Sequence, residues 1–108
     1  MNRIIITEAR NVWGDKSTGT KWFDADRAER FGEDTRWDGR NNISVATNSQ
    51  TEHESLYRTA GGRWILCEWS DWEGTRTTYT EIPKERADDW LLKNDHEIPE
   101  SELAAREV

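Results

Sequence analysis

The sequence is poor in the residues that usually build or brace a small domain. Leucine, isoleucine, valine and phenylalanine make up only 17 of the 108 residues, below the roughly 20 % at which a charged chain is suspected of disorder. Cys67 is the single cysteine, which excludes an internal disulfide. The chain also has no signal-peptide pattern and no apolar run approaching about 18 residues. We therefore expect a small hydrophobic core, no membrane span and a cytoplasmic location.

Motifs with well-understood chemistry are missing as well. The sequence has no glycine loop that would cradle a phosphate, no paired cysteines for zinc and no nucleophile elbow. Basic charge is scarce, since the formal net charge is −7, and binding of nucleic acid through its phosphates needs a basic surface. These absences predict a protein that is not an enzyme, holds no cofactor or metal and makes no direct contact with nucleic acid. They favour a basic protein as its partner.

Tryptophan, by contrast, is abundant. The chain has seven, and each can bury on the order of 150–250 Å², so a few of them replace many aliphatic residues. With 108 residues the chain has the length of one ordinary domain. We expect a compact domain over residues 1–95, followed by an acidic, flexible tail over residues 96–108 that has little to bury.

β-branched residues indicate two strands near the N-terminus. Residues 4–7 form the first and residues 20–23 the second, with turn chemistry between them at residues 14–19. Asp24 can then cap a short helix that ends at Gly32. The inward face of that helix would consist of Ala25, Ala28 and Phe31.

The next segment, residues 33–49, is rich in Asp, Gly, Asn and Thr. This composition predicts an irregular loop. Its few large apolar side chains would pin it to the domain: Trp37, Ile43 and Val45.

The clearest structural signal is a β-hairpin over residues 56–69. Two apolar runs flank Gly61 and Gly62, which can adopt the positive φ angles of a tight two-residue turn. In the resulting register Tyr57 faces Leu66. Trp64 alternates with Leu66 along its strand, so we expect it in the core.

A third strand and a helix follow the hairpin. A turn at Gly74 leads to a strand over residues 76–80, which completes a three-stranded meander. Pro83 suits the first position of a helix, and Asn94 suits its end. The inward stripe of this helix would consist of Ala87, Trp90 and Leu91.

A weak internal repeat links two of these segments. Residues 23–31 and 82–90 share the order apolar, acid, Arg, Ala, acid, aromatic, which suggests that each predicted strand leads into a short helix packed on the sheet. The predicted fold class is therefore α+β. It consists of a small antiparallel β-sheet, made of the three-stranded meander and the N-terminal strands, packed with two short helices.

The two histidines have acidic neighbours on both sides. His53 lies between two glutamates, and His96 lies between Asp95 and Glu97. Neighbouring side chains of a strand point in opposite directions, so the glutamates beside His53 would point away from it. The predicted tail has no rigid element to fix the acids beside His96, so we expect both histidines to be solvated rather than to hold a metal. The acidic stretch at residues 34–42 lacks the frame and closing Glu of a calcium loop. Cys67, in the predicted central strand, is interpreted as a packing residue.

The segment over residues 69–76 combines two tryptophans with an arginine, the residue types that dominate protein interfaces. We expect Trp69 to point inward and Trp72 to lie on the surface. The helix after Pro83 adds two acids opposite its apolar stripe. The predicted partner-binding residues are Asp71, Trp72, Glu73, Arg76, Glu85 and Asp89.

The block from Tyr57 to Asn94 resembles a motif of small uncharacterised bacterial and mobile-element proteins. Its signature reads Y-R-T, G-R-W-I-L, W-S-x-W-x-G and W-L-L-x-N and covers about a third of the chain. The resemblance implies only a compact strand-strand-strand-helix unit. In size and acidity the chain is also similar to phage-encoded, anti-CRISPR-like inhibitors of nucleic-acid-processing defence systems, which present carboxylates to a basic groove.

Three functions follow from these features. The first is a non-enzymatic acidic protein that regulates or inhibits a basic, nucleic-acid-processing partner; the resemblance implies a phage or mobile-element origin. The second is a small hydrolase or nuclease that uses His53 with Glu52, Glu54 or the carboxylates of residues 34–38. The third is an antitoxin-like module in which an edge strand over residues 76–79 pairs with a second copy to form a homodimer.

Overall fold

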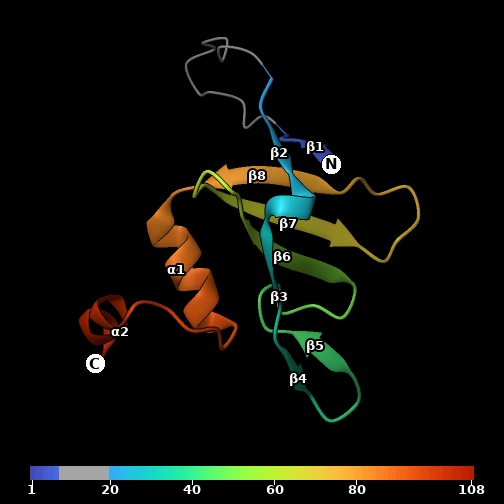
Figure 1. Cartoon of the computed structure of the whole chain (residues 1–108). Coiled ribbons are helices and arrows are strands. Elements are labelled where there is room, and N and C mark those ends of the chain that lie inside the picture. The colour runs from blue at the N-terminus through green and yellow to red at the C-terminus, as the bar shows by residue number, and fades with distance from the viewer. Residues whose placement is uncertain (8–19) are drawn as a thin grey trace, which may run out of the picture.

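A four-stranded antiparallel sheet in the order β3-β6-β7-β8 forms the centre of the molecule (Figure 1). The computed structural model describes residues 1–7 and 20–108. Its α+β architecture confirms the predicted fold class, and β6, β7 and β8 form the predicted meander. The strands of this sheet are β3 (Glu29–Gly32), β6 (Glu52–Arg58), β7 (Trp64–Ser70) and β8 (Thr78–Ile82).

The turn between β6 and β7 is one residue longer than predicted. The amide of Thr59 donates to the carbonyl of Arg63 at 2.8 Å, which closes a three-residue loop, and the last loop residue, Gly62, has a φ of +79°. Hairpins of this length commonly place a glycine at such a position. The predicted pairing of Tyr57 with Leu66 is therefore wrong by one residue.

The corrected register decides which side chains form the core. Leu56 lies opposite Leu66, so both point to the same face of the sheet, whereas the predicted register puts them on opposite faces. α1 (Lys84–Lys93) packs against this face. The buried core cluster consists of Leu56, Leu66, Ile82, Ala87, Trp90 and Leu91, with Phe31, Ala46, Trp64 and Ile98 half-buried against it.

The predicted helix after Pro83 is confirmed. Its apolar stripe of Ala87, Trp90 and Leu91 is buried, and Asn94 ends it, since the Asn94 side chain donates to the carbonyl of Trp90 at 2.9 Å. Pro83 itself is the N-cap residue rather than the first helical residue.

A two-stranded ribbon covers the opposite face of the sheet. β1 (Arg3–Ile5) pairs with β2 (Trp22–Asp24), close to the predicted strands at residues 4–7 and 20–23. Buried Phe23 packs against Tyr57 and Tyr79, with ring centroids 5.2 Å and 6.1 Å away. The turn predicted at residues 14–19 lies outside the described residues.

The helix predicted over residues 24–31 is wrong. Asp24 does act as a cap, because its carboxylate accepts from the amide of Asp26, but the helical segment is only the single 3₁₀ turn η1 (Ala25–Arg27). The chain then extends into β3, where Phe31 pairs with Leu56 of β6. An open strand edge supplies hydrogen bonds and apolar contacts that outweigh a weak local helix preference. The repeat shared with residues 82–90 therefore does not correspond to a repeated structure.

Residues 33–49 form a hairpin rather than an irregular loop. β4 (Thr35–Trp37) pairs with β5 (Asn42–Ser44), and the Asp38 carboxylate accepts from two turn amides, those of Arg40 and Asn41. Trp37 is 66 % exposed, so its prediction as an anchor is wrong. The hairpin extends beyond the sheet (Figure 1), and in the described part of the chain Trp37 is not among the side chains packed against the core cluster.

The C-terminal segment 96–108, predicted to be a flexible tail, contains α2 (Glu100–Arg106). Ile98 packs against the core cluster, and an Arg106 guanidinium nitrogen lies 2.9 Å from the Asp89 carboxylate of α1. Within the described parts of the chain, no helix is both long and apolar enough to cross a membrane.

Candidate binding surface

The loop between β7 and β8, residues 71–77, presents an exposed tryptophan. Trp72 is 66 % exposed, as predicted, although its backbone is held in place. Its amide donates to the Ser70 hydroxyl at 3.2 Å, and its carbonyl accepts from the Thr75 hydroxyl at 2.7 Å. Gly74 follows with a φ of +82°, which only glycine adopts without strain. The loop backbone is therefore ordered while the indole remains free to contact another molecule.

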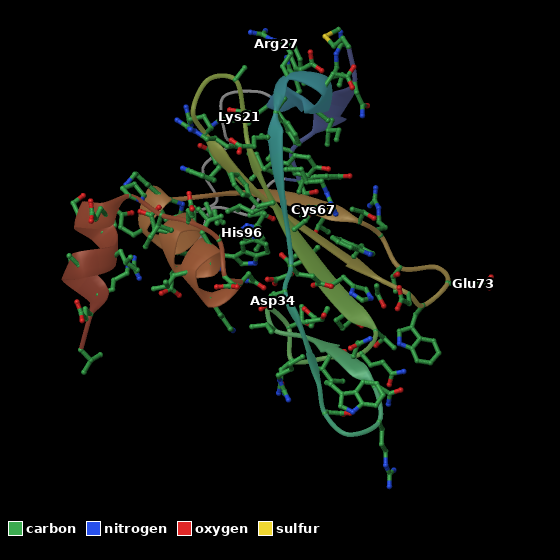
Figure 2. All side chains as sticks on the ribbon, turned by 60° about the horizontal axis from the view of Figure 1, so that its bottom comes forward. Lys21, Arg27, Asp34, Cys67, Glu73 and His96 are labelled. Atoms are coloured by element: carbon green, nitrogen blue, oxygen red, sulfur yellow. The ribbon has the colours of Figure 1, made fainter. Side chains whose placement is uncertain are left out.

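The other predicted residues of this loop are exposed as well. Asp71, Glu73 and Arg76 all lie at the surface, and Glu73 marks the outermost part of the loop (Figure 2). Trp69, predicted to point inward, is half-buried on the preceding strand. The loop thus carries Trp72 and Arg76, two residue types that are enriched in interface hot spots, together with two acids.

A second exposed tryptophan projects from the same end of the sheet. This is Trp37 at the end of β4. The segment that follows β5 and the β7–β8 loop both bond the start of β6: the Thr47 hydroxyl donates to the carbonyl of Glu52 at 2.7 Å, and the amide of Asp71 donates to the carbonyl of Thr51 at 2.9 Å. No local signal marks Trp37 as a surface residue, because an isolated apolar side chain in a polar segment can equally be an anchor.

His53 holds the base of the loop, and the prediction that it is solvated is wrong. Its Nδ1 lies 2.6 Å from Glu33 Oε1 and its Nε2 lies 2.9 Å from Asp71 Oδ2. Its ring stacks on Trp69, with centroids 5.5 Å apart. We refer to Glu33, His53 and Asp71 as the histidine clamp. It joins the β3–β4 bend, β6 and the β7–β8 loop.

Glu33 is the centre of this network. Besides His53, it accepts from the Ser44 hydroxyl at 2.6 Å and from the Glu54 amide at 2.9 Å. Its side chain is only 12 % exposed. No local pattern points to Glu33, because its partners lie 11, 20 and 21 residues further along the chain.

The chemistry of the clamp fits a positioning role. The hydrogen bond to Asp71, with a further contribution from Glu33, raises the pKa of His53, although partial burial opposes the shift. An ionised carboxylate can only accept hydrogen bonds, so two carboxylates require both ring nitrogens to donate. Such an imidazolium has no free nitrogen that could take a proton from a substrate.

The carboxylates that the sequence offered to His53 do not reach it. Glu54 points to the other face of β6, where its carboxylate accepts from the Trp90 indole at 3.0 Å. Glu52 accepts from Ser70, Asp34 bonds the neighbouring amide of Thr35, and Asp38 caps its own turn. Among residues 1–7 and 20–108, no three His, Cys, Asp or Glu side chains are grouped so that they could hold a metal ion.

The two predicted acids of α1 belong to a separate patch. Glu85 and Asp89 are exposed, but β8 runs from the loop toward α1, so the loop and the helix lie at opposite ends of that strand (Figures 1 and 2). Asp89 is also paired with Arg106 of α2 at 2.9 Å. The six predicted binding residues therefore do not form one surface, because the strand between them separates the two groups.

His96 and Cys67 both lie inside the fold. His96, predicted to be solvated, lies between α1 and the sheet (Figure 2), where its Nε2 is 2.6 Å from the carbonyl of Gly32 and its ring stacks on Trp90. Cys67 is a buried free thiol in the central strand, in agreement with its predicted packing role. Burial raises the pKa of the Cys67 thiol, which disfavours the reactive thiolate.

The edge strand β8 lies two residues further along the chain than the predicted strand over residues 76–80, and it is less open than predicted. It begins at Thr78 rather than at residue 76. At Tyr79 both backbone groups are engaged, since the carbonyl accepts from the Thr7 amide at 2.6 Å and the amide donates to the Thr7 hydroxyl at 3.1 Å. This leaves less edge for pairing with a second copy.

Comparisons of the chain with protein-family models, with curated proteins and with solved structures find no match. The resemblance of residues 57–94 to small mobile-element proteins stays a prediction.

Proposed function

We propose that this protein is a non-enzymatic, acidic binding protein that regulates or inhibits a basic, nucleic-acid-processing protein partner. The observation that carries the proposal is Trp72, 66 % exposed on a loop whose backbone is fixed by hydrogen bonds. A large apolar side chain exposed on an ordered loop loses little conformational entropy on binding, which favours its use as an anchor.

Charge supports a basic partner. Asp71 and Glu73 flank the indole, and the whole chain carries a formal net charge of −7. Opposite charge accelerates encounter and excludes wrong partners more than it tightens the final complex. Trp72 would therefore supply most of the affinity, and the acids would supply selectivity. The same acids would repel a phosphate backbone, so the proposal assigns recognition to protein rather than to nucleic acid.

The proposal includes a cytoplasmic location and a phage or mobile-element origin. The location rests on a single cysteine, which is a buried free thiol. The origin rests on the size and acidity that the chain shares with phage-encoded inhibitors.

Affinity capture from host extract tests the proposal, with bound proteins identified by mass spectrometry. Trp72→Ala should abolish capture of a basic protein, and Glu73→Lys should weaken it. Trp22→Ala is the matched control, because Trp22 is also exposed, at 49 %, but lies on the N-terminal ribbon. Retention of the same partner by Trp72→Ala, at an unchanged melting temperature, would reject the proposed surface.

A further inference from the structure

A cavity lies between α1 and the sheet, away from the Trp72 loop. Its volume is about 580 Å³, within the roughly 300–1,000 Å³ that is typical of ligand pockets. Phe31, Trp64 and Leu91 give it an apolar floor, and each of them belongs to the core cluster or packs against it. The charged residues that line it are Glu29, Arg58, Lys84, Asp88 and Glu97.

Asp88 is the most deeply buried charged group of this lining, at 2 % exposed. Its carboxylate has one recorded partner in the described chain, the Lys84 ammonium at 3.1 Å, and the Lys84 side chain is itself 57 % exposed. A carboxylate offers about four acceptor sites, and the bond from Lys84 leaves some of those of Asp88 open to a further donor. Asp88 can therefore gain from a further cationic donor that enters the cavity.

The aromatic wall of the cavity is suited to a cation as well. The Arg58 guanidinium carbon lies 5.9 Å from the centroid of the Trp64 ring, which shows that a planar cation fits beside this indole. Stacking of a guanidinium on a tryptophan is favourable and becomes stronger when water is excluded. Trp64 and Asp88 together provide a stacking surface and a carboxylate within one cavity.

The charges of the lining favour a cation over an anion. Its two bases are already engaged, Lys84 with Asp88 and Arg58 with Trp64. Glu29 and Glu97, by contrast, make no ion pair with any other described residue. An anion would have to displace a base from its partner beside three carboxylates. A guanidinium would release two exposed bases to water, Lys84 from Asp88 and Arg58 from Trp64, and would leave a cation at each place.

We propose that this cavity binds the guanidinium group of an arginine side chain presented by a protein partner, with Trp64 as the stacking surface and Asp88 as the carboxylate that pairs with it. A guanidinium matches a carboxylate through two parallel hydrogen bonds, which a lysine ammonium cannot form. This inference goes beyond the proposed function and does not depend on the Trp72 loop.

Titration with the blocked peptide Ac-Gly-Arg-Gly-NH₂, followed by the indole N–H resonance of Trp64, tests the proposal. We expect a saturable shift of that resonance. The same peptide with citrulline in place of arginine keeps the shape without the charge and should bind at least about tenfold more weakly. Equal binding of the citrulline peptide, preferential binding of Ac-Gly-Glu-Gly-NH₂, or no saturable shift would overturn the proposal.

Variants of adjacent residues supply the matched control. Asp88→Asn removes the charge at nearly constant size and should weaken arginine binding at least about tenfold. Asp89→Asn, on the exposed side of the same helix, should leave it within about twofold. If Asp88→Asn unfolds the protein, Glu97→Gln at the exposed rim replaces it, with an expected loss of about two- to threefold. If the Asp88 variant, or the Glu97 variant that replaces it, binds the arginine peptide as tightly as the Asp89 variant does, the assignment is overturned. This outcome does not depend on the result for Trp72.

Discussion

Replacement of Glu33 by alanine removes the acceptor of three hydrogen bonds at once. The Ser44 hydroxyl, the Glu54 amide and the His53 ring all lose their partner. Ser44 is buried, and each buried donor left unsatisfied costs about 1–3 kcal/mol. Water can reach the half-buried His53 and replace its lost partner, so we expect the free energy of unfolding to fall by about 3 kcal/mol in total. This is a large share of the roughly 5–15 kcal/mol by which domains are stable.

Urea unfolding followed by circular dichroism at pH 6 measures this loss. Glu33→Gln keeps one carbonyl acceptor and should cost about half as much. Glu52→Ala is the control, since Glu52 is an exposed residue of β6 whose carboxylate, among the described residues, accepts only from the Ser70 hydroxyl, at 3.1 Å. It should lower the free energy of unfolding by less than about 0.5 kcal/mol. If Glu33→Ala costs no more than Glu52→Ala, the clamp does not hold the fold and the reasoning fails.

Three further predictions concern His53, the two tryptophans Trp64 and Trp72, and the glycines of the β6–β7 loop. The folded-state pKa of His53 is raised above its usual value of 6.5. The stabilisation by protonated His53 is therefore fully present below about pH 6.5 and is lost as pH rises through the folded pKa. Urea midpoints measured from pH 5 to 9 should fall over that window, and His53→Gln should make them less dependent on pH. Trp64→Ala should lower the free energy of unfolding by about 3 kcal/mol because the indole packs against the core cluster. Trp72→Ala should change it by less than about 0.5 kcal/mol, and equal thermal destabilisation by the two variants would place both indoles in the core. Gly62→Ala should cost about 1 kcal/mol or more because φ is +79° there, and Gly61→Ala, whose new Cβ would meet only the Thr59 hydroxyl at 3.8 Å, should be nearly neutral in the same melts.

The amino-acid sequence by itself determined the elements that depend on neighbouring residues. Alternating apolar residues around two glycines predict the β6–β7 hairpin, and the spacing of Ala87, Trp90 and Leu91 predicts the buried face of α1. The exposure of Trp72 followed from the turn residues around it. These signals are local, because the periods of 2 and 3.6 residues act within one element.

The tertiary structure alone decided the features that depend on distant residues. Residues 29–32 form a strand because the edge of β6 was open to them. One additional loop residue shifts the register of the hairpin, so that Leu56 and Leu66 point to the same face of the sheet. His53 reaches both Glu33 and Asp71 only after three strands have been aligned. No local pattern specifies such contacts, since each is selected by the hydrogen bonds and packing that the assembled sheet makes available.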